Sequence, residues 1–148
     1  MRKILLLCAA VFAFGSELSE REKNEIALYE QILSSLKAEQ IPQFIVGIVA
    51  GRLPYKIDEH TILSSLEASG VTLVGRFKLT DAPGRKISKF NAAQLEGLKR
   101  EFIANGVGAI CKNSAGAAIL NKGVRLRGVY ELGGRRAFEI NADKSSCE

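Results

Sequence analysis

The chain has 148 residues and a formal net charge of +5, with 25% charged and 47% apolar residues. The length suits one domain that buries its own core, and the composition is ordinary for a soluble globular protein. No apolar run reaches the roughly 20 residues that a membrane-spanning helix needs.

The N-terminus carries the longest apolar run in the sequence. Arg2 and Lys3 precede eleven apolar residues, 4–14, and small residues stand near the end of the run. This order is typical of a secretory signal peptide. We therefore predict a signal peptide over residues 1–15 and a single domain over 16–148, periplasmic or secreted, with no transmembrane anchor after signal removal. A buried N-terminal helix is the alternative, but it would place both basic residues against the core.

Loss of this leader removes Cys8 and two positive charges, which leaves Cys111, Cys147 and a net charge of +3. Such a charge is mildly basic and is not that of a polyanion-binding protein. An even number of cysteines in an oxidising compartment usually means a disulfide. We predict the bond Cys111–Cys147. The alternative, a catalytic thiol, needs a neighbouring base, and the only histidine is His60.

Two helices are expected at the start of the exported domain. Ser19 and Glu22 have the spacing of a capping box, and one apolar stripe follows, which predicts a helix over residues 20–39. The stripe consists of Ile26, Tyr29, Ile32, Leu33 and Leu36. The next apolar run, 42–51, is ambiguous. Pro42 suits the first turn of a helix, whereas its β-branched residues suit a strand, and we favour a helix.

Residues 53–58 are expected to be extended around Pro54, and a β-hairpin follows. A two-residue turn at Ser69-Gly70 places the apolar residues of both strands on one face. The predicted pairs are Ala68 with Val71, Leu66 with Leu73, and Ile62 with Phe77.

A polar loop over residues 80–90 leads to a second helical region. Asn91 and Gln94 have capping-box spacing, and the expected buried stripe is Leu95, Leu98, Phe102 and Ile103. Gly106 and Gly108 are expected to break or bend this helix before Cys111. Ser114 can cap a short helix that Gly123 ends.

The last predicted element is a second hairpin around Gly133-Gly134. The apolar pattern requires Tyr130 opposite Phe138 and Gly128 opposite Ile140, which needs a three-residue turn or a bulge. The expected fold class is therefore α+β, with the order helix–hairpin–helix–hairpin and an antiparallel sheet that carries its helices on one face.

A spaced set of residues in this chain resembles a family of small, mostly uncharacterised exported proteins of Gram-negative bacteria. These proteins pair a Leu-Pro-x-x-Ile/Val-Asp segment with two cysteines that bracket a Gly-Val strand and a final hairpin. The matching residues are Leu53-Pro54, Ile57-Asp58, Thr61, Leu63, Gly70-Val71-Thr72-Leu73, Cys111, Gly123-Val124, Tyr130, Phe138 and Cys147. The resemblance implies export, a disulfide and an α+β fold, and it implies no catalytic activity.

Residues of catalytic type cluster only at Asp58-Glu59-His60. Neighbours in an extended or turning segment point apart, whereas an acid–base pair must converge in a pocket. We interpret this segment as a solvated turn in which Asp58 caps local N–H groups, and an enzyme site here is the alternative. With one histidine, the sequence contains no recognisable transition-metal site, and no cofactor is predicted. The glycines at 106 and 108 lack the third glycine of a dinucleotide loop.

Positive charge gathers near the C-terminus, where Arg125 and Arg127 alternate with apolar residues and Arg135 and Arg136 stand at the hairpin turn. These four arginines are the candidate partner-binding residues, for an envelope protein or another acidic surface. A solvated sheet face is the alternative. Nucleic-acid binding lacks the interleaved aromatic residues it would need. The favoured function is a non-enzymatic protein that binds an envelope component; a structural subunit that uses residues 44–49 as its contact is a further alternative.

Overall fold

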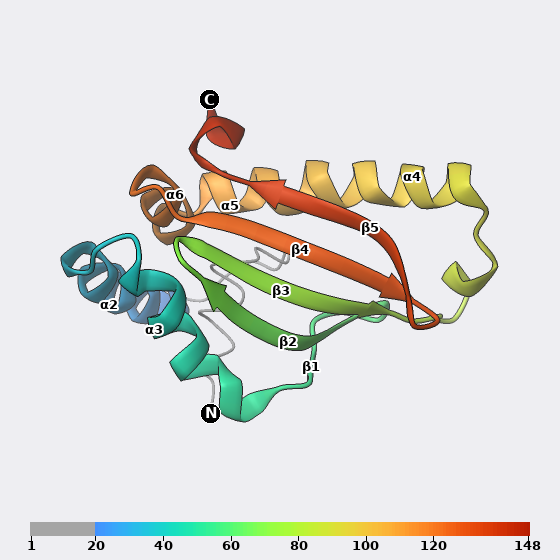
Figure 1. Ribbon diagram of the computed structural model, residues 1–148, viewed down its shortest axis with the longest axis horizontal. Coiled ribbons are helices and arrows are strands. Elements are labelled where there is room, and N and C mark those ends of the chain that lie inside the picture. Colours follow the sequence, from blue (N-terminus) through green and yellow to red (C-terminus); the bar gives the residue numbers. More distant parts are fainter. Residues whose placement is uncertain (1–19) are drawn as a thin grey trace.

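The computed structural model describes residues 20–148. The predicted signal peptide and Ser19, the first residue of the predicted capping box, therefore lie outside the described residues. The chain forms one five-stranded sheet, and Figure 1 shows helices packed against it, so the predicted α+β class is confirmed. The elements are α2 (Glu20–Ser35), α3 (Gln40–Val49), β1 (Tyr55–Lys56), β2 (Thr61–Ser69), β3 (Thr72–Leu79), α4 (Ala92–Phe102), α5 (Gly108–Lys112), α6 (Ser114–Asn121), β4 (Arg125–Leu132) and β5 (Arg135–Ala142).

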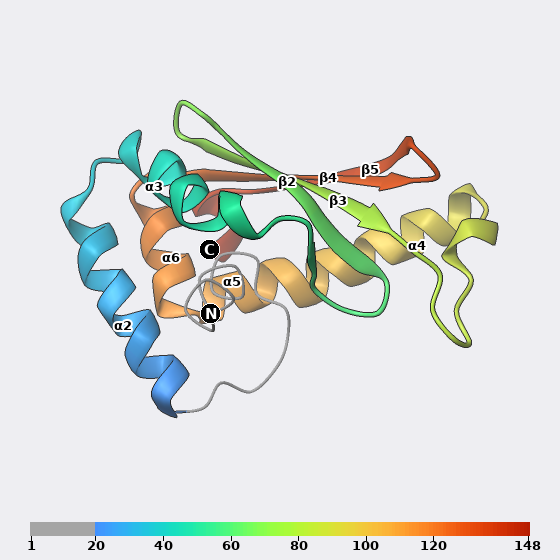
Figure 2. The ribbon, with the colours of Figure 1, turned by 90° about the horizontal axis from the view of Figure 1, so that it is seen from below.

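The strands are arranged in the order β1-β2-β3-β4-β5, and the two hairpins meet in the middle of the sheet. The sheet was expected to be antiparallel, and three of its neighbouring pairs are, but β3 and β4 are parallel. A parallel pair needs a long crossover connection, which α4, α5 and α6 supply. Figure 2 shows α2, α4, α5 and α6 on one side of the sheet, while no helix in the described part lies over the other face of β4 and β5.

The N-terminal helices form as predicted, with two differences. α2 ends at Ser35 rather than 39, and Ile32 is 38% exposed, whereas Leu33 is buried. The ambiguous run is helical, with Pro42 in the first turn of α3, where its missing N–H leaves no hydrogen bond unmade. Ile41, Ile45 and Val49 of α3 are buried in the core, so packing decides the conformation of this β-branched segment.

Lys122 fixes the C-terminal end of α2. Its Nζ donates hydrogen bonds to the carbonyl oxygens of Leu33 at 3.0 Å and Leu36 at 2.7 Å, and also to that of Ser34. The last carbonyls of a helix lack intrahelical partners and carry partial negative charge, so an ammonium group stabilises them. This contact joins α2 to the end of α6.

The register predicted for the first hairpin is wrong. The turn lies at Gly70-Val71, so Ser69 pairs with Thr72 and Leu66 with Gly75. A β-bulge between Leu63 and Ser65 then shifts the ladder and brings Leu63, rather than Ile62, opposite Phe77. Leu63 is fully buried while Ile62 is half-buried, because the extra residue exchanges the two faces of the strand. The bulge residue Ser64 donates its hydroxyl to the carbonyl oxygen of Arg76.

The second helical region begins as predicted and then differs. Asn91 and Gln94 form both hydrogen bonds of the capping box. The glycines at 106 and 108 do not break the helix, because a π-helical turn, Ile103–Val107, connects α4 to α5. Ile103 is 39% exposed rather than buried. A π turn holds extra residues and rotates the following face, so the 3.6-residue periodicity fails at this position.

The short helix α6 is capped by Asn113, not by Ser114 as predicted. The Asn113 side chain accepts hydrogen bonds from the N–H groups of Ala115 and Gly116. Gly123 ends the helix with a φ of +99°, which glycine adopts readily. The N–H groups of Gly123 and Val124 then bond back to the carbonyls of Leu120 and Ile119, as in a Schellman motif.

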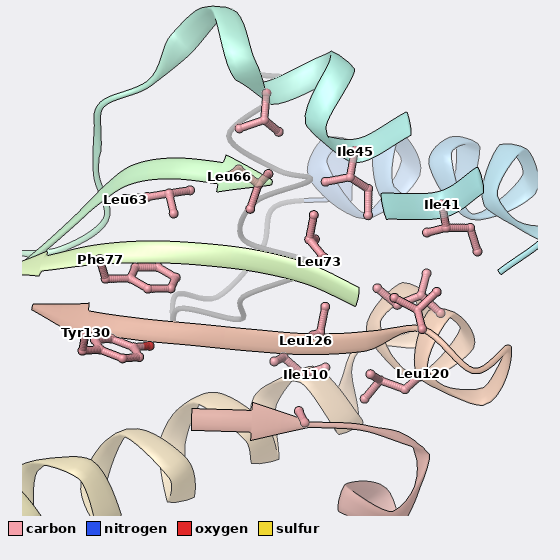
Figure 3. Packing of buried hydrophobic residues seen from close by; sticks show 14 of the residues in the cluster. Ile41, Ile45, Leu63, Leu66, Leu73, Phe77, Ile110, Leu120, Leu126 and Tyr130 are labelled. Carbon is pink, nitrogen blue, oxygen red and sulfur yellow. The ribbon is translucent and has the colours of Figure 1, made fainter. Parts of the chain in front are cut away.

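The predicted pairing of the second hairpin is confirmed. Tyr130 lies opposite Phe138 and Gly128 opposite Ile140, and a bulge next to Tyr130 allows the two-residue turn Gly133-Gly134. The Phe77 and Tyr130 rings stack at 4.6 Å across the parallel strands, and Phe138 extends the stack at 4.9 Å. Figure 3 shows the Phe77 and Tyr130 rings together in the core on the helix side of β3 and β4.

The predicted disulfide Cys111–Cys147 is present, with its Cα atoms 5.3 Å apart. It ties α5 to the short 3-10 helix Lys144–Cys147 and closes a loop of 36 residues. Loop-closure entropy gives such a bond about 3–4 kcal/mol of stabilisation.

Gly128 is expected to tolerate no side chain. An added Cβ would lie 3.0 Å from Cε2 of Tyr130 and 3.3 Å from Cε2 of Phe77. We predict that Gly128→Ala lowers the free energy of unfolding by about 1–3 kcal/mol because the stacked rings must move. Gly97→Ala in α4, where no atom lies within 4 Å of the new Cβ, is the control and should not destabilise. Equal stability of both variants in urea denaturation would contradict this account.

Lys122→Met should weaken the attachment of α2. The variant keeps the aliphatic stem but leaves the carbonyl groups at the end of α2 without their cationic donor, at a cost of about 1–2 kcal/mol. The substitution should therefore accelerate amide hydrogen exchange more in α2 than in β3 or β4. Lys112→Met, at an exposed position of α5, is the matched control. Unchanged protection of α2 in the Lys122 variant would show that helix packing alone holds it.

Candidate protein-binding surface

The face of the sheet that turns away from α4, α5 and α6 is named the outer face here. Leu126, Gly128 and Tyr130 of β4 point into the core, so the alternating residues between them point outward. The outer face of β3, β4 and β5 carries Val74, Arg76, Lys78, Arg125, Arg127, Val129, Glu131, Arg136, Glu139 and Asn141. Long charged side chains thus surround a small apolar centre.

Three charged side chains on this face form what we call the Glu139 cluster: Arg127, Arg136 and Glu139. Arg127 donates from Nε to Glu139 Oε1 at 2.7 Å and from Nη2 to Oε2 at 3.0 Å. Arg136 Nη1 lies 3.4 Å from Oε2 of the same carboxylate. The cluster therefore holds two guanidinium groups around one carboxylate.

Hydrogen bonds from Arg127 lower the pKa of Glu139 because they stabilise the ionised carboxylate, and Asn141 adds a smaller contribution. The same bonds raise the pKa of Arg127. Glu139 is therefore ionised throughout the physiological pH range, and the net charge of the cluster is +1.

A second ion pair crosses the parallel strands. Arg76 Nη1 of β3 lies 3.4 Å from Glu131 Oε1 of β4. Val129 stands between Arg76 and Glu139 in the strand register and is only 2% exposed, although it is on the outer face. Long charged side chains cover apolar surface with their stems, which accounts for this burial.

The structure separates the four predicted arginines. Arg125, Arg127 and Arg136 share the outer face, while Arg135 stands at the start of β5, beside the Gly133-Gly134 turn. Arg136 and Arg127 both contact Glu139, and Arg125, Arg135 and Arg136 are all exposed. Sequence reasoning missed Arg76 because it belongs to the other hairpin and reaches this surface through the parallel pairing of β3 and β4.

The Asp58-Glu59-His60 segment forms a turn before β2. Asp58 Oδ1 accepts a hydrogen bond from the backbone N–H of His60 at 2.8 Å, and Asp58 and Glu59 are exposed. The ring of His60 contacts the Thr80 carbonyl oxygen through Nδ1 at 3.2 Å. The expected capping role of Asp58 is therefore observed, and the Asp58 and His60 side chains contact different backbone groups rather than each other.

The basic loop before α4 is fixed to that helix. Arg85 donates two hydrogen bonds to Glu101, of 3.2 and 2.7 Å, and lies over the Phe90 ring at 5.9 Å. These bonds lower the pKa of Glu101. The loop resembles the Glu139 cluster in its chemistry but lies off the outer face of the sheet.

Within residues 20–148, no group of three or more His, Cys, Asp or Glu side chains is placed to bind a metal ion. The helices in the same part of the chain are all too short or too polar to cross a membrane.

Three solved structures resemble this chain over most of its length. A candidate secreted protein of Pseudomonas aeruginosa matches with a TM-score of 0.60 and 12% identity, covering 75% of this chain and 93% of the other. The type II secretion system pilotin AspS of Vibrio cholerae matches with a TM-score of 0.58 and 17% identity, over 82% and 98%. The type II secretion pilotin EpsS of Vibrio vulnificus matches with a TM-score of 0.57 and 18% identity, over 75% and 92%.

All three share this fold. At these identities the likeness is one of fold alone, and it agrees with the resemblance to small exported Gram-negative proteins. No protein-family model and no curated protein sequence matches the chain.

The carboxyl group of Glu139 should titrate below the ordinary glutamate value of about 4.3. Arg127→Gln removes the main cause of this shift, so the pKa should rise toward the ordinary value. Because the folded pKa is depressed, the ion pair stabilises the fold above the unfolded pKa and is lost as pH falls through the folded one. Carboxyl ¹³C NMR titration measures both proteins, and an identical pKa in the two would show that the ion pair does not persist in solution.

Proposed function

We propose that this protein is a small, exported, non-enzymatic component of the Gram-negative cell envelope that binds another envelope protein through the outer face of its sheet. The observation that carries the proposal is the uncovered outer face with its charged residues, in a fold shared with two secretion-system pilotins. The proposed partner-binding residues are Arg125, Arg127, Arg135 and Arg136, and we add Arg76 because the pairing of β3 with β4 brings it onto the same face.

The disulfide supports the location. A bond between Cys111 and Cys147 persists in an oxidising compartment and is rare in a reducing cytosol. This agrees with the predicted signal peptide over residues 1–15. The proposed location is therefore the periplasm or the extracellular space.

The two alternative functions receive less support. An enzyme site at Asp58-Glu59-His60 needs convergent side chains, and those of Asp58 and Glu59 are exposed at a turn. A structural subunit that binds through residues 44–49 needs a free apolar stretch. Ile45 and Val49 are buried within this chain, however, and Phe44, Val46 and Ile48 pack against the same core.

Neutralising the outer face should abolish partner capture. We predict that the triple variant Arg125→Gln, Arg127→Gln and Arg136→Gln folds but loses its cross-linked partner in intact cells, because three cationic donors leave the surface together. The wild-type cross-linked product is identified by mass spectrometry, and its yield is the measured quantity.

The control triple variant is Lys86→Gln, Lys89→Gln and Lys112→Gln, which removes the same charge from exposed positions elsewhere. It should retain capture. Equal yields from the two triple variants, both with wild-type circular dichroism, would exclude the outer face as the binding surface.

A further inference from the structure

We infer that Glu139 is an internal competitor for the docking segment of the partner, and that this segment presents carboxylate side chains, which replace Glu139 on Arg127 and Arg136. This inference rests on the proposed function and specifies both the chemistry of the partner and a restraint on its binding.

The geometry of Arg127 identifies the ligand chemistry. Its Nε and Nη2 atoms face the two oxygens of one carboxylate at 2.7 and 3.0 Å, the fork arrangement in which a guanidinium group binds a carboxylate. Glu139 on the same outer face thus shows that this arginine binds a carboxylate group. A carboxylate from another protein can make the same pair of bonds.

Arg136 supplies the second cation. Its contact with Glu139 is a single long one of 3.4 Å, and its side chain is 57% exposed. Most of its five N–H donors are therefore available to a second carboxylate. With two arginines and one glutamate, the cluster keeps a charge of +1 that attracts an acidic segment.

The surroundings of the cluster favour an acidic segment with several carboxylates. On the same face, Arg76 also meets a carboxylate, that of Glu131, while Lys78 is exposed two residues after Arg76 on β3 and Arg125 is exposed two residues before Arg127 on β4. Each central strand thus carries two cations one strand repeat of about 7 Å apart, Arg125 and Arg127 on β4 and Arg76 and Lys78 on β3, and the two pairs extend in opposite directions from the level of Glu139.

Glu139 can be displaced at small energetic cost. The Arg127 side chain is 41% exposed and that of Glu139 is 25% exposed, and exposed ion pairs contribute only about 0–1 kcal/mol. An incoming carboxylate exchanges one such pair for another. Removal of the Glu139 charge should therefore strengthen binding, because it raises the charge of the cluster from +1 to +2.

The test uses the mature chain and a fluorescent oligoglutamate peptide, with affinity measured by anisotropy at low and physiological salt. We expect Glu139→Gln to bind the peptide about fivefold more tightly than wild type. The double variant Arg127→Gln and Glu139→Gln should lose this gain, because the freed guanidinium group is absent.

The matched control is Glu101→Gln. Glu101 also binds one arginine, Arg85, through two hydrogen bonds, and its replacement changes the net charge equally. If both glutamate variants bind the peptide more tightly by the same factor, the gain comes from net charge alone, and the inference is overturned. Unchanged or weaker binding by Glu139→Gln would also overturn it, and weaker binding would make Glu139 a positioning residue for Arg127.

Two outcomes separate this inference from the proposed function. If Glu139→Gln gains nothing while the arginine triple variant still loses its partner in cells, the binding surface stands and the competition fails. If Glu139→Gln gains affinity only for vesicles that contain phosphatidylglycerol and not for the peptide, the surface binds lipid head groups, and both the acidic segment and the proposed protein partner are wrong.

Discussion

The parallel pairing of β3 with β4 is the constraint on which the molecule depends. It brings two hairpins into one sheet and stacks Phe77 on Tyr130 at 4.6 Å above the glycine at position 128. The crossover that parallel strands require carries α4, α5 and α6 to the same side, so the core forms there. The other face is left to solvent, and Arg76 of one hairpin comes beside the charged residues of the other. The proposed binding surface is thus a consequence of strand topology.

Local patterns predicted the elements better than the contacts between them. The register of β4 with β5 could be predicted because aromatic residues at 130 and 138 must share a face and the Gly-Gly turn limits the possible offsets. The register of β2 with β3 could not, since no residue type marks Ser64 as a bulge. The parallel pairing joins segments about fifty residues apart, and periodicity within either hairpin carries no information about it.

In the candidate site too, the sequence predicted the positions of single residues better than the contacts between them. The alternation of β4 placed Arg125 and Arg127 on the polar face from sequence alone. What sequence could not supply is the fork geometry, in which both oxygens of Glu139 face Arg127 and Arg136 approaches from its own strand. That arrangement depends on the bulge beside Tyr130, which shifts Arg136 and Ala137 relative to β4.

The covalent link from α5 to the last turn of the chain encloses α6, β4 and β5 within one ring. The exposed Gly133-Gly134 tip lies inside that ring. A protease that cleaves the tip would therefore release no fragment: the clipped molecule keeps its mass apart from one added water, and β5 stays tethered beside β4. This closure allows the arginine-bearing strands to stay together after a cut at the exposed tip.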